Sequence, residues 1–144
     1  MTLAIAILIL LLSLLAWLGQ VVSAAAPEVA AQLGLMEKKT DVEPTYYVDV
    51  RAECIWDAMT LWVLPVAASL LVVGGRGWPL LALIGGGVYV YFAGRGIVQR
   101  ILMQRRGIAV GNPKTVKVFY LFLGLWGAAG LAAILLASFE LVWR

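Results

Sequence analysis

The chain has 144 residues, of which 63% are hydrophobic and 13% are charged, with a formal net charge of +3. A soluble domain usually carries about a quarter charged residues, so this composition, with a mean hydropathy of +0.97, excludes a water-soluble globular domain. The absence of histidine and the single cysteine exclude histidine-based haem or zinc sites and an internal disulfide. We therefore expect neither a metal centre nor a bound cofactor.

Four stretches of the chain are long and apolar enough to cross a membrane, because a spanning helix needs about 20 mostly apolar residues. Backbone groups cannot stay unpaired in lipid, so each stretch is expected to be a helix. The predicted spans are residues 3–23, 45–74, 78–105 and 117–142. We predict an all-α polytopic membrane protein whose four transmembrane helices form one antiparallel bundle over residues 1–144.

The first connection, residues 24–44, is polar and mixed in charge. Within it Val29, Leu33 and Met36 recur at helical spacing. This spacing predicts a short helix over residues 27–36 that lies in the plane of the membrane interface. A plain solvated loop is the alternative.

The basic residues indicate how the helices are oriented. Small residues around Ser23 resemble a signal-peptide cleavage site, but no basic residue precedes the first apolar stretch, so we expect the first helix to be retained. Nine Lys or Arg residues then fall on the side of the first and third connections, and only Arg76 and Arg144 fall opposite. Because cytoplasmic loops are enriched in basic residues, we expect both termini to be external, in a bacterial inner membrane. Four basic residues are expected to contact anionic lipid headgroups: Arg105, Arg106, Lys114 and Lys117.

The second predicted helix carries three carboxylates, Asp49, Glu53 and Asp57, whose four-residue spacing places them on one face. Pro65 is expected to kink this helix about halfway across the membrane. The end of the third predicted helix supplies the opposite side of a candidate polar cluster. Its polar residues are Tyr91, Arg95, Gln99 and Arg100.

Equal spacing from Arg76 places Asp57 and Arg95 at the same depth. Opposite charges at one depth predict an ion pair that locks the two helices together, and a proton relay or a polar cavity is the alternative. The outer charged residues are expected to be solvated or to contact lipid headgroups. These are Asp49, Glu53, Arg100 and Arg105.

The last predicted helix has Gly124, Ala128 and Ala132 at four-residue spacing. Small residues allow helix backbones to approach closely in lipid. This face is therefore expected to pack inside the bundle, or against a protein partner or a second copy of the chain.

The four-helix plan resembles the DoxX-like group of small bacterial membrane proteins, with Arg51-Ala52 opening the second helix and Gly94-Arg95 closing the third. That resemblance implies a four-helix membrane protein, and many members of the group have no assigned activity. The topology is also similar to that of the MAPEG family of glutathione-using membrane enzymes. The second helix of that family reads R-x-x-x-N-x-x-E, whereas here Ile55 and Ala58 occupy the Asn and Glu places.

The sequence contains no nucleophile paired with a base and no glycine-rich phosphate loop, so no residue is assigned a catalytic role. We expect a small integral membrane protein without catalytic activity, acting as an accessory or scaffold subunit. One alternative is a MAPEG-like or lipid-modifying enzyme with a site between the second and third helices on the cytoplasmic side. Another is transport of protons or a small solute through Asp57 and Arg95. Membrane lipids are the expected partners, and nothing indicates nucleic acid.

Overall fold

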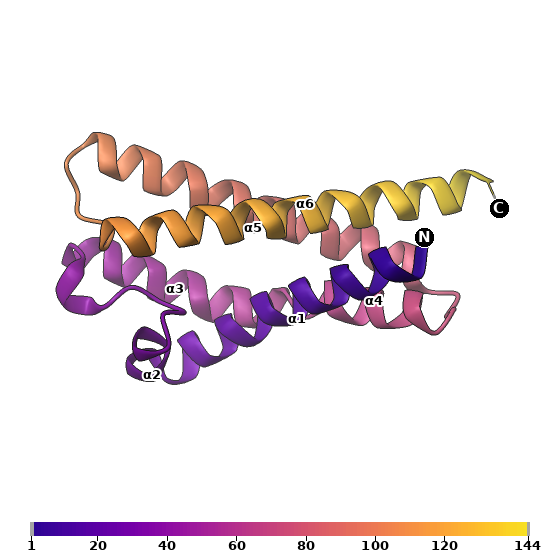
Figure 1. Ribbon diagram of the computed structural model, residues 1–144, viewed down its shortest axis with the longest axis horizontal. Helices are drawn as coiled ribbons and strands as arrows, with labels where there is room; N and C mark the ends of the chain where they lie inside the picture. The colour runs from indigo at the N-terminus through magenta and orange to yellow at the C-terminus, as the bar shows by residue number, and fades with distance from the viewer. Residues whose placement is uncertain (1, 144) are drawn as a thin grey trace.

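The computed structural model describes residues 2–143, and within them it is all-helical, as predicted (Figure 1). Besides the helices, these residues form one isolated antiparallel bridge, between Val42 and Val110. The elements in chain order are α1 (Thr2–Ala25), α2 (Pro27–Gln32), the 3-10 helix η1 (Lys39–Asp41), α3 (Pro44–Thr60), α4 (Val63–Val72), α5 (Trp78–Arg105) and α6 (Pro113–Trp143).

Four helical segments are long and apolar enough to cross a membrane: α1, the successive helices α3 and α4 taken together, α5 and α6. Their outward faces carry exposed large aliphatic side chains, such as Leu11, Leu121 and Leu135. Side chains of this kind are covered by hydrocarbon when a helix bundle lies in a bilayer. The structure is therefore that of a membrane-embedded helical protein.

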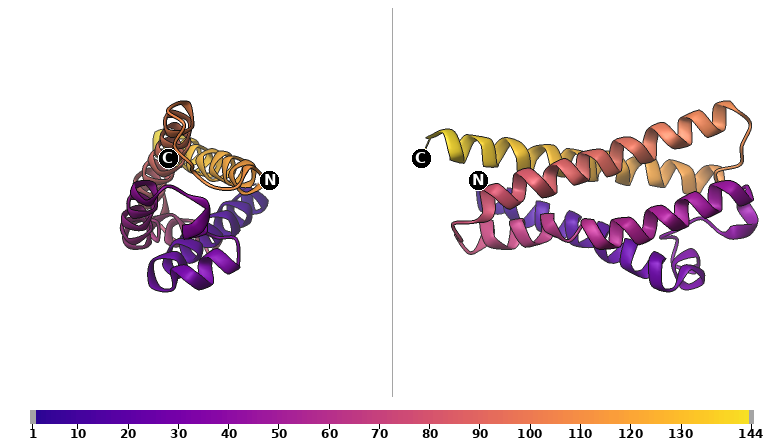
Figure 2. Two further views of the ribbon diagram at one scale, coloured as in Figure 1. Left: turned by 90° about the vertical axis from the view of Figure 1, so that its left-hand side faces the viewer. Right: turned by 180° about the vertical axis from the view of Figure 1, so that it is seen from behind.

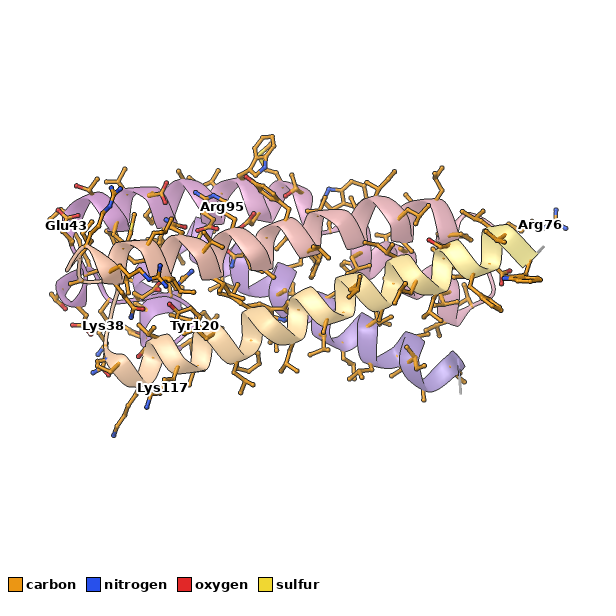
Figure 3. The ribbon with its side chains drawn as sticks, turned by 90° about the horizontal axis from the view of Figure 1, so that it is seen from above. Lys38, Glu43, Arg76, Arg95, Lys117 and Tyr120 are labelled. Carbon is orange, nitrogen blue, oxygen red and sulfur yellow. The ribbon has the colours of Figure 1, made fainter. Side chains whose placement is uncertain are left out.

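The two ends of the molecule differ in their connections. The loop end contains α2, the connection from residue 33 to 43, and the α5–α6 connection; the turn end contains the α4–α5 turn, the start of α1 and the end of α6 (Figure 1). Lys38, Glu43 and Lys117 lie at the loop end and Arg76 lies at the turn end (Figure 3). The loop-end connections and the adjoining helix ends also hold Lys39, Arg105, Arg106 and Lys114, so most of the basic residues are gathered at this end.

The long helix that contains the acidic face is broken at Leu61 and Trp62, between α3 and α4. Pro65 has no N–H group, and its ring clashes with the carbonyl four residues earlier, which belongs to Leu61. The break expected from Pro65 is found there. Beyond it α4 packs closely along α5, whereas α3 has few close contacts with α5.

The turn half of the bundle is closely packed through glycines. A Cβ atom at Gly86 would lie 2.6 Å from the carbonyl oxygen of Gly130, and one at Gly85 would lie 2.7 Å from the backbone nitrogen of Leu64. The backbone of α5 therefore touches both α6 and α4. Toward the loop end α5 and α6 separate (Figure 2). On α6 the small residues Gly124 and Ala128, which we singled out, face outward.

Side-chain hydrogen bonds fix α1 against the rest of the bundle at three places. The hydroxyl of the fully buried Tyr89 donates to the carbonyl of Ser13 over 2.7 Å. The indole of Trp17 donates to the carbonyl of Ala58 over 3.0 Å. A third link comes from Arg51, whose guanidinium donates to the carbonyls of Ser23 and Ala24 in the last turn of α1, where carbonyls lack partners within the helix.

The connections differ from the predicted bounds. The helix predicted over residues 27–36 ends at Gln32, and Gly34 follows with φ of 72°. Residues 33–38, which we call the strap, then place the side chains of Met36 and Glu37 in the interior. The last helix begins at Pro113 rather than at residue 117, because Asn112 caps it by accepting the amide of Lys114 over 3.0 Å.

Candidate functional site at the loop end

A groove of ≈ 220 Å³ lies between α3 and α5, on the loop side of the break at Leu61. We call it the α3–α5 groove. Trp56 and Tyr91 stand at its rim, with 63% and 65% of their surfaces exposed. The lining residues are Ala52, Glu53, Trp56 and Asp57 from α3 and Tyr91, Phe92 and Arg95 from α5.

The Arg95 guanidinium forms the ion pairs beside the groove. Its Nη1 pairs with Glu53 Oε1, and its Nη2 lies 3.4 Å from each carboxylate oxygen of Asp49. The side-chain amide of Gln99 also donates to Asp49. The structure thus brings together six of the residues that the helical spacing selected: Asp49, Glu53, Asp57, Tyr91, Arg95 and Gln99.

The predicted ion pair between Asp57 and Arg95 is not formed in the described part of the chain. The guanidinium of Arg95 instead extends toward the loop end and meets carboxylates one and two turns away, at Glu53 and Asp49. Long basic side chains reach in this way toward the more polar end of a membrane helix. Asp57 itself is only 7% exposed, and its Oδ2 has no hydrogen-bond partner.

Arg100 is also placed differently from the prediction, since it is buried rather than solvated. Its Nη2 donates to Glu37 Oε1 over 2.9 Å, and Tyr46 donates to the same oxygen over 2.9 Å. The guanidinium also donates to the Gly96 carbonyl over 3.2 Å and lies 5.4 Å from the Phe119 ring centroid. Glu37, Tyr46 and Arg100 form what we call the buried triad.

Glu37 was not singled out from the sequence because it lies beside Lys38 and Lys39 in a polar connection. The feature of the sequence that could have indicated its burial is the apolar pair Leu35 and Met36 immediately before it. Two apolar residues in an otherwise polar loop favour an inward turn, and Met36 is indeed buried. The strap therefore carries a carboxylate into the bundle.

A small cavity of ≈ 50 Å³ lies between the buried triad and the α3–α5 groove. It shares Glu53 and Phe92 with the groove, and Glu37 and Arg100 also line it. Three buried polar atoms of its lining residues have no protein partner: Gln20 Oε1, Arg100 Nε and Trp126 Nε1. These unpartnered polar atoms, set in a mostly apolar lining, suit ordered water.

An apolar cleft of ≈ 100 Å³ lies on the opposite side of this cavity, between α1 and α6. It shares Gln20, Leu35, Phe119 and Trp126 with the cavity. The remaining lining is mostly aliphatic or aromatic, including Leu15 and Phe122. The loop half of the bundle therefore combines a polar interior with an apolar side wall.

The basic residues expected at lipid headgroups are all exposed at the loop end. They are Arg105, Arg106, Lys114 and Lys117. Their contact with lipid stays a prediction.

The chemistry available at this site is that of ion pairs, amides and aromatic rings. Over residues 2–143 no group of three or more Asp, Glu or Cys side chains is arranged to hold a metal ion. The thiol of Cys54 is buried. No protein-family model, curated protein or solved structure matches this chain.

Proposed function

We propose that this chain is a small non-catalytic protein of the bacterial inner membrane that binds the polar headgroup of a membrane amphiphile in the α3–α5 groove. It would act as an accessory or scaffold subunit. The observation that carries the proposal is the unpartnered carboxylate oxygen of Asp57, which belongs to a nearly buried side chain on the wall of a groove with an aromatic rim.

The proposed arrangement is an antiparallel bundle with the loop end in the cytoplasm and both termini external. The excess of basic residues at the loop end supports this orientation. Asp57 lies 15 residues before Val72, the end of α4, which corresponds to about 22 Å of helix. A hydrocarbon core is about 30 Å thick, so Asp57 would lie in the cytoplasmic half of the membrane, toward the headgroups.

The dimensions of the groove support a headgroup as the ligand. Its ≈ 220 Å³ is smaller than the roughly 300–1,000 Å³ of pockets that enclose a drug-sized molecule. The exposed Trp56 and Tyr91 stand at its rim, and such side chains are enriched at membrane interfaces, where one part is apolar and the other wet. A ligand with its head in the groove would keep its acyl chains along the outer faces of α3 and α5.

The packing of the turn half supports a binding role over transport through Asp57 and Arg95. A cavity between α4 and α5 in the turn half measures only ≈ 10 Å³ and is lined by apolar residues, among them Leu64, Trp78 and Ala82. The contact between Gly86 and Gly130 brings α5 and α6 together in this half. A charged solute crossing here would have to separate these helices.

A lipid-modifying or MAPEG-like enzyme is the second candidate. The observation in its favour is the unpartnered carboxylate oxygen of Asp57, because an unpaired carboxylate in a groove can act as a general base.

Two further expectations from the sequence also stand as proposals. One is the resemblance to the DoxX-like group, and the other is self-association of the chain through the outward-facing Gly124 and Ala128.

Lipid analysis of the purified chain tests the proposed function. The protein would be purified in a mild detergent, and the retained lipids would be measured by mass spectrometry. We expect one headgroup class to be enriched over the membrane extract, and Trp56→Ala to reduce that enrichment. Trp62→Ala is the matched control, because Trp62 is exposed but does not line the groove. Retained lipids that match the bulk extract in both variants would refute the proposal.

A further inference from the structure

We infer that the α3–α5 groove selects headgroups that carry a primary ammonium, with the ammonium bound by Asp57. This inference rests on the proposed function and names the class of lipid. It corresponds to a zwitterionic phospholipid such as phosphatidylethanolamine.

The charge balance at the groove favours a cation. Two carboxylates, those of Glu53 and Asp57, and the single guanidinium of Arg95 line the groove, and Asp49 pairs with the same guanidinium from one turn closer to the start of α3. Arg95 is engaged by Asp49 and Glu53, so Asp57 is left without an ion pair. Removing a carboxylate from water is costly unless it is paired, and a bound ammonium would supply the missing partner. The same surplus of negative charge disfavours a headgroup with a net negative charge.

The carboxylate of Asp57 needs a hydrogen-bond donor, which favours a cation that carries N–H groups. Asp57 lines the groove, and its Oδ2, which has almost no accessible surface, accepts no hydrogen bond from the protein. A ligand meets this oxygen when the carboxylate turns toward the groove, and the carboxylate then gains most from a donor placed directly against it. A primary ammonium has three such donors, whereas a trimethylammonium has none, so the carboxylate would discriminate between the two headgroups.

The other lining residues suit the rest of such a headgroup. The aromatic rings of Trp56, Tyr91 and Phe92 surround the space beside Asp57, and aromatic faces attract organic cations. Arg95 lines the same groove with a side chain that is one-third exposed, and its contacts with Asp49 are long, at 3.4 Å. A phosphate that follows the ammonium can therefore reach the guanidinium from the open side.

The test measures thermal unfolding of the full chain in detergent while lipids with identical acyl chains are added. A ligand that binds the folded state raises the unfolding temperature, and the rise grows with the logarithm of the ligand concentration divided by its dissociation constant. We expect phosphatidylethanolamine to raise it, and phosphatidylcholine and phosphatidylglycerol to leave it close to the lipid-free value. Asp57→Asn should weaken the apparent affinity for phosphatidylethanolamine by roughly tenfold or more. Asp41→Asn, an exposed change outside the groove, should leave the response intact.

Each contrary outcome has its own meaning. Equal responses to all three lipids would overturn the ammonium inference and leave headgroup binding in place. No response to any lipid, together with no headgroup enrichment after purification, would overturn both. Free ethanolamine is added as a further arm; a response equal to that of the lipid would overturn the assignment of a lipid as the source of the ammonium. An unchanged response in Asp57→Asn would remove Asp57 from the site.

Discussion

Glu37 and Arg100 form an ion pair of 2.9 Å in which the carboxylate residue is 3% exposed and the arginine 7% exposed. The two residues come from different parts of the chain, since Glu37 lies in the strap and Arg100 lies near the end of α5. Tyr46 adds a hydrogen bond from α3 to the same oxygen. One carboxylate therefore joins the strap to two helices.

Removing either partner of this pair should destabilise the protein. Glu37→Ala and Arg100→Ala each leave a buried charge without its partner, which costs on the order of 3–5 kcal/mol. Thermal and denaturant unfolding in detergent would measure the loss. Glu28→Ala is the control, because Glu28 is an exposed acidic residue of the same connection, and it should change the free energy of unfolding little. Losses of similar size for Glu28 and Glu37 would show that the pair contributes nothing specific.

Neutralising two neighbouring carboxylates on α3 should have different effects on the free energy of unfolding. Asp57→Asn removes a buried, unpartnered charge, so we expect the lipid-free protein to gain on the order of 1 kcal/mol or to stay unchanged. Glu53→Gln removes an ion pair with Arg95 and should cost roughly 1–3 kcal/mol. Both variants are compared by unfolding in lipid-free detergent. A larger loss for Asp57→Asn than for Glu53→Gln would mean that Asp57 has a partner in the protein.

The glycine contact between α5 and α6 should tolerate no added methyl group. Gly86→Ala places a Cβ 2.6 Å from the Gly130 carbonyl oxygen, and overpacking of this kind costs about 1–3 kcal/mol. Gly87→Ala is a control one residue away, because nothing lies within 4 Å of its Cβ position. We expect the control to unfold at or slightly above the temperature of the wild type. If both alanines behaved alike, the helices would not be in contact at Gly86.

The proposed orientation can be tested by labelling cysteines. Cys54 is the single cysteine of the chain, so Cys54→Ala provides a background for Lys39→Cys and Arg76→Cys. A thiol reagent that cannot cross membranes should label position 76 in intact cells, and position 39 only after the cells are opened. Reporter fusions after Lys39 and Arg106 should likewise read cytoplasmic, and one at Arg144 should read external. The reverse pattern would overturn the orientation and revive cleavage after the first helix.

Helical periodicity was sufficient to predict the acidic face of α3 and the opposing face of α5. Asp49, Glu53 and Arg95 meet because a tight turn leaves little freedom in how two successive helices align. The exact partner of Arg95 could not be predicted, since a long arginine side chain reaches carboxylates on more than one turn. The position of Glu37 could not be predicted from helical periodicity either, because the path of a loop depends on contacts with distant helices.

The bridge between Val42 and Val110 joins the first connection to the α5–α6 connection, and the amide of Glu43 also donates to the Ala109 carbonyl over 2.9 Å. These bonds join the two connections directly. A displacement of the α5–α6 connection would therefore also move the residues that follow the strap. Because Glu37 of the strap is paired with Arg100, that movement would reach α5, which flanks the groove.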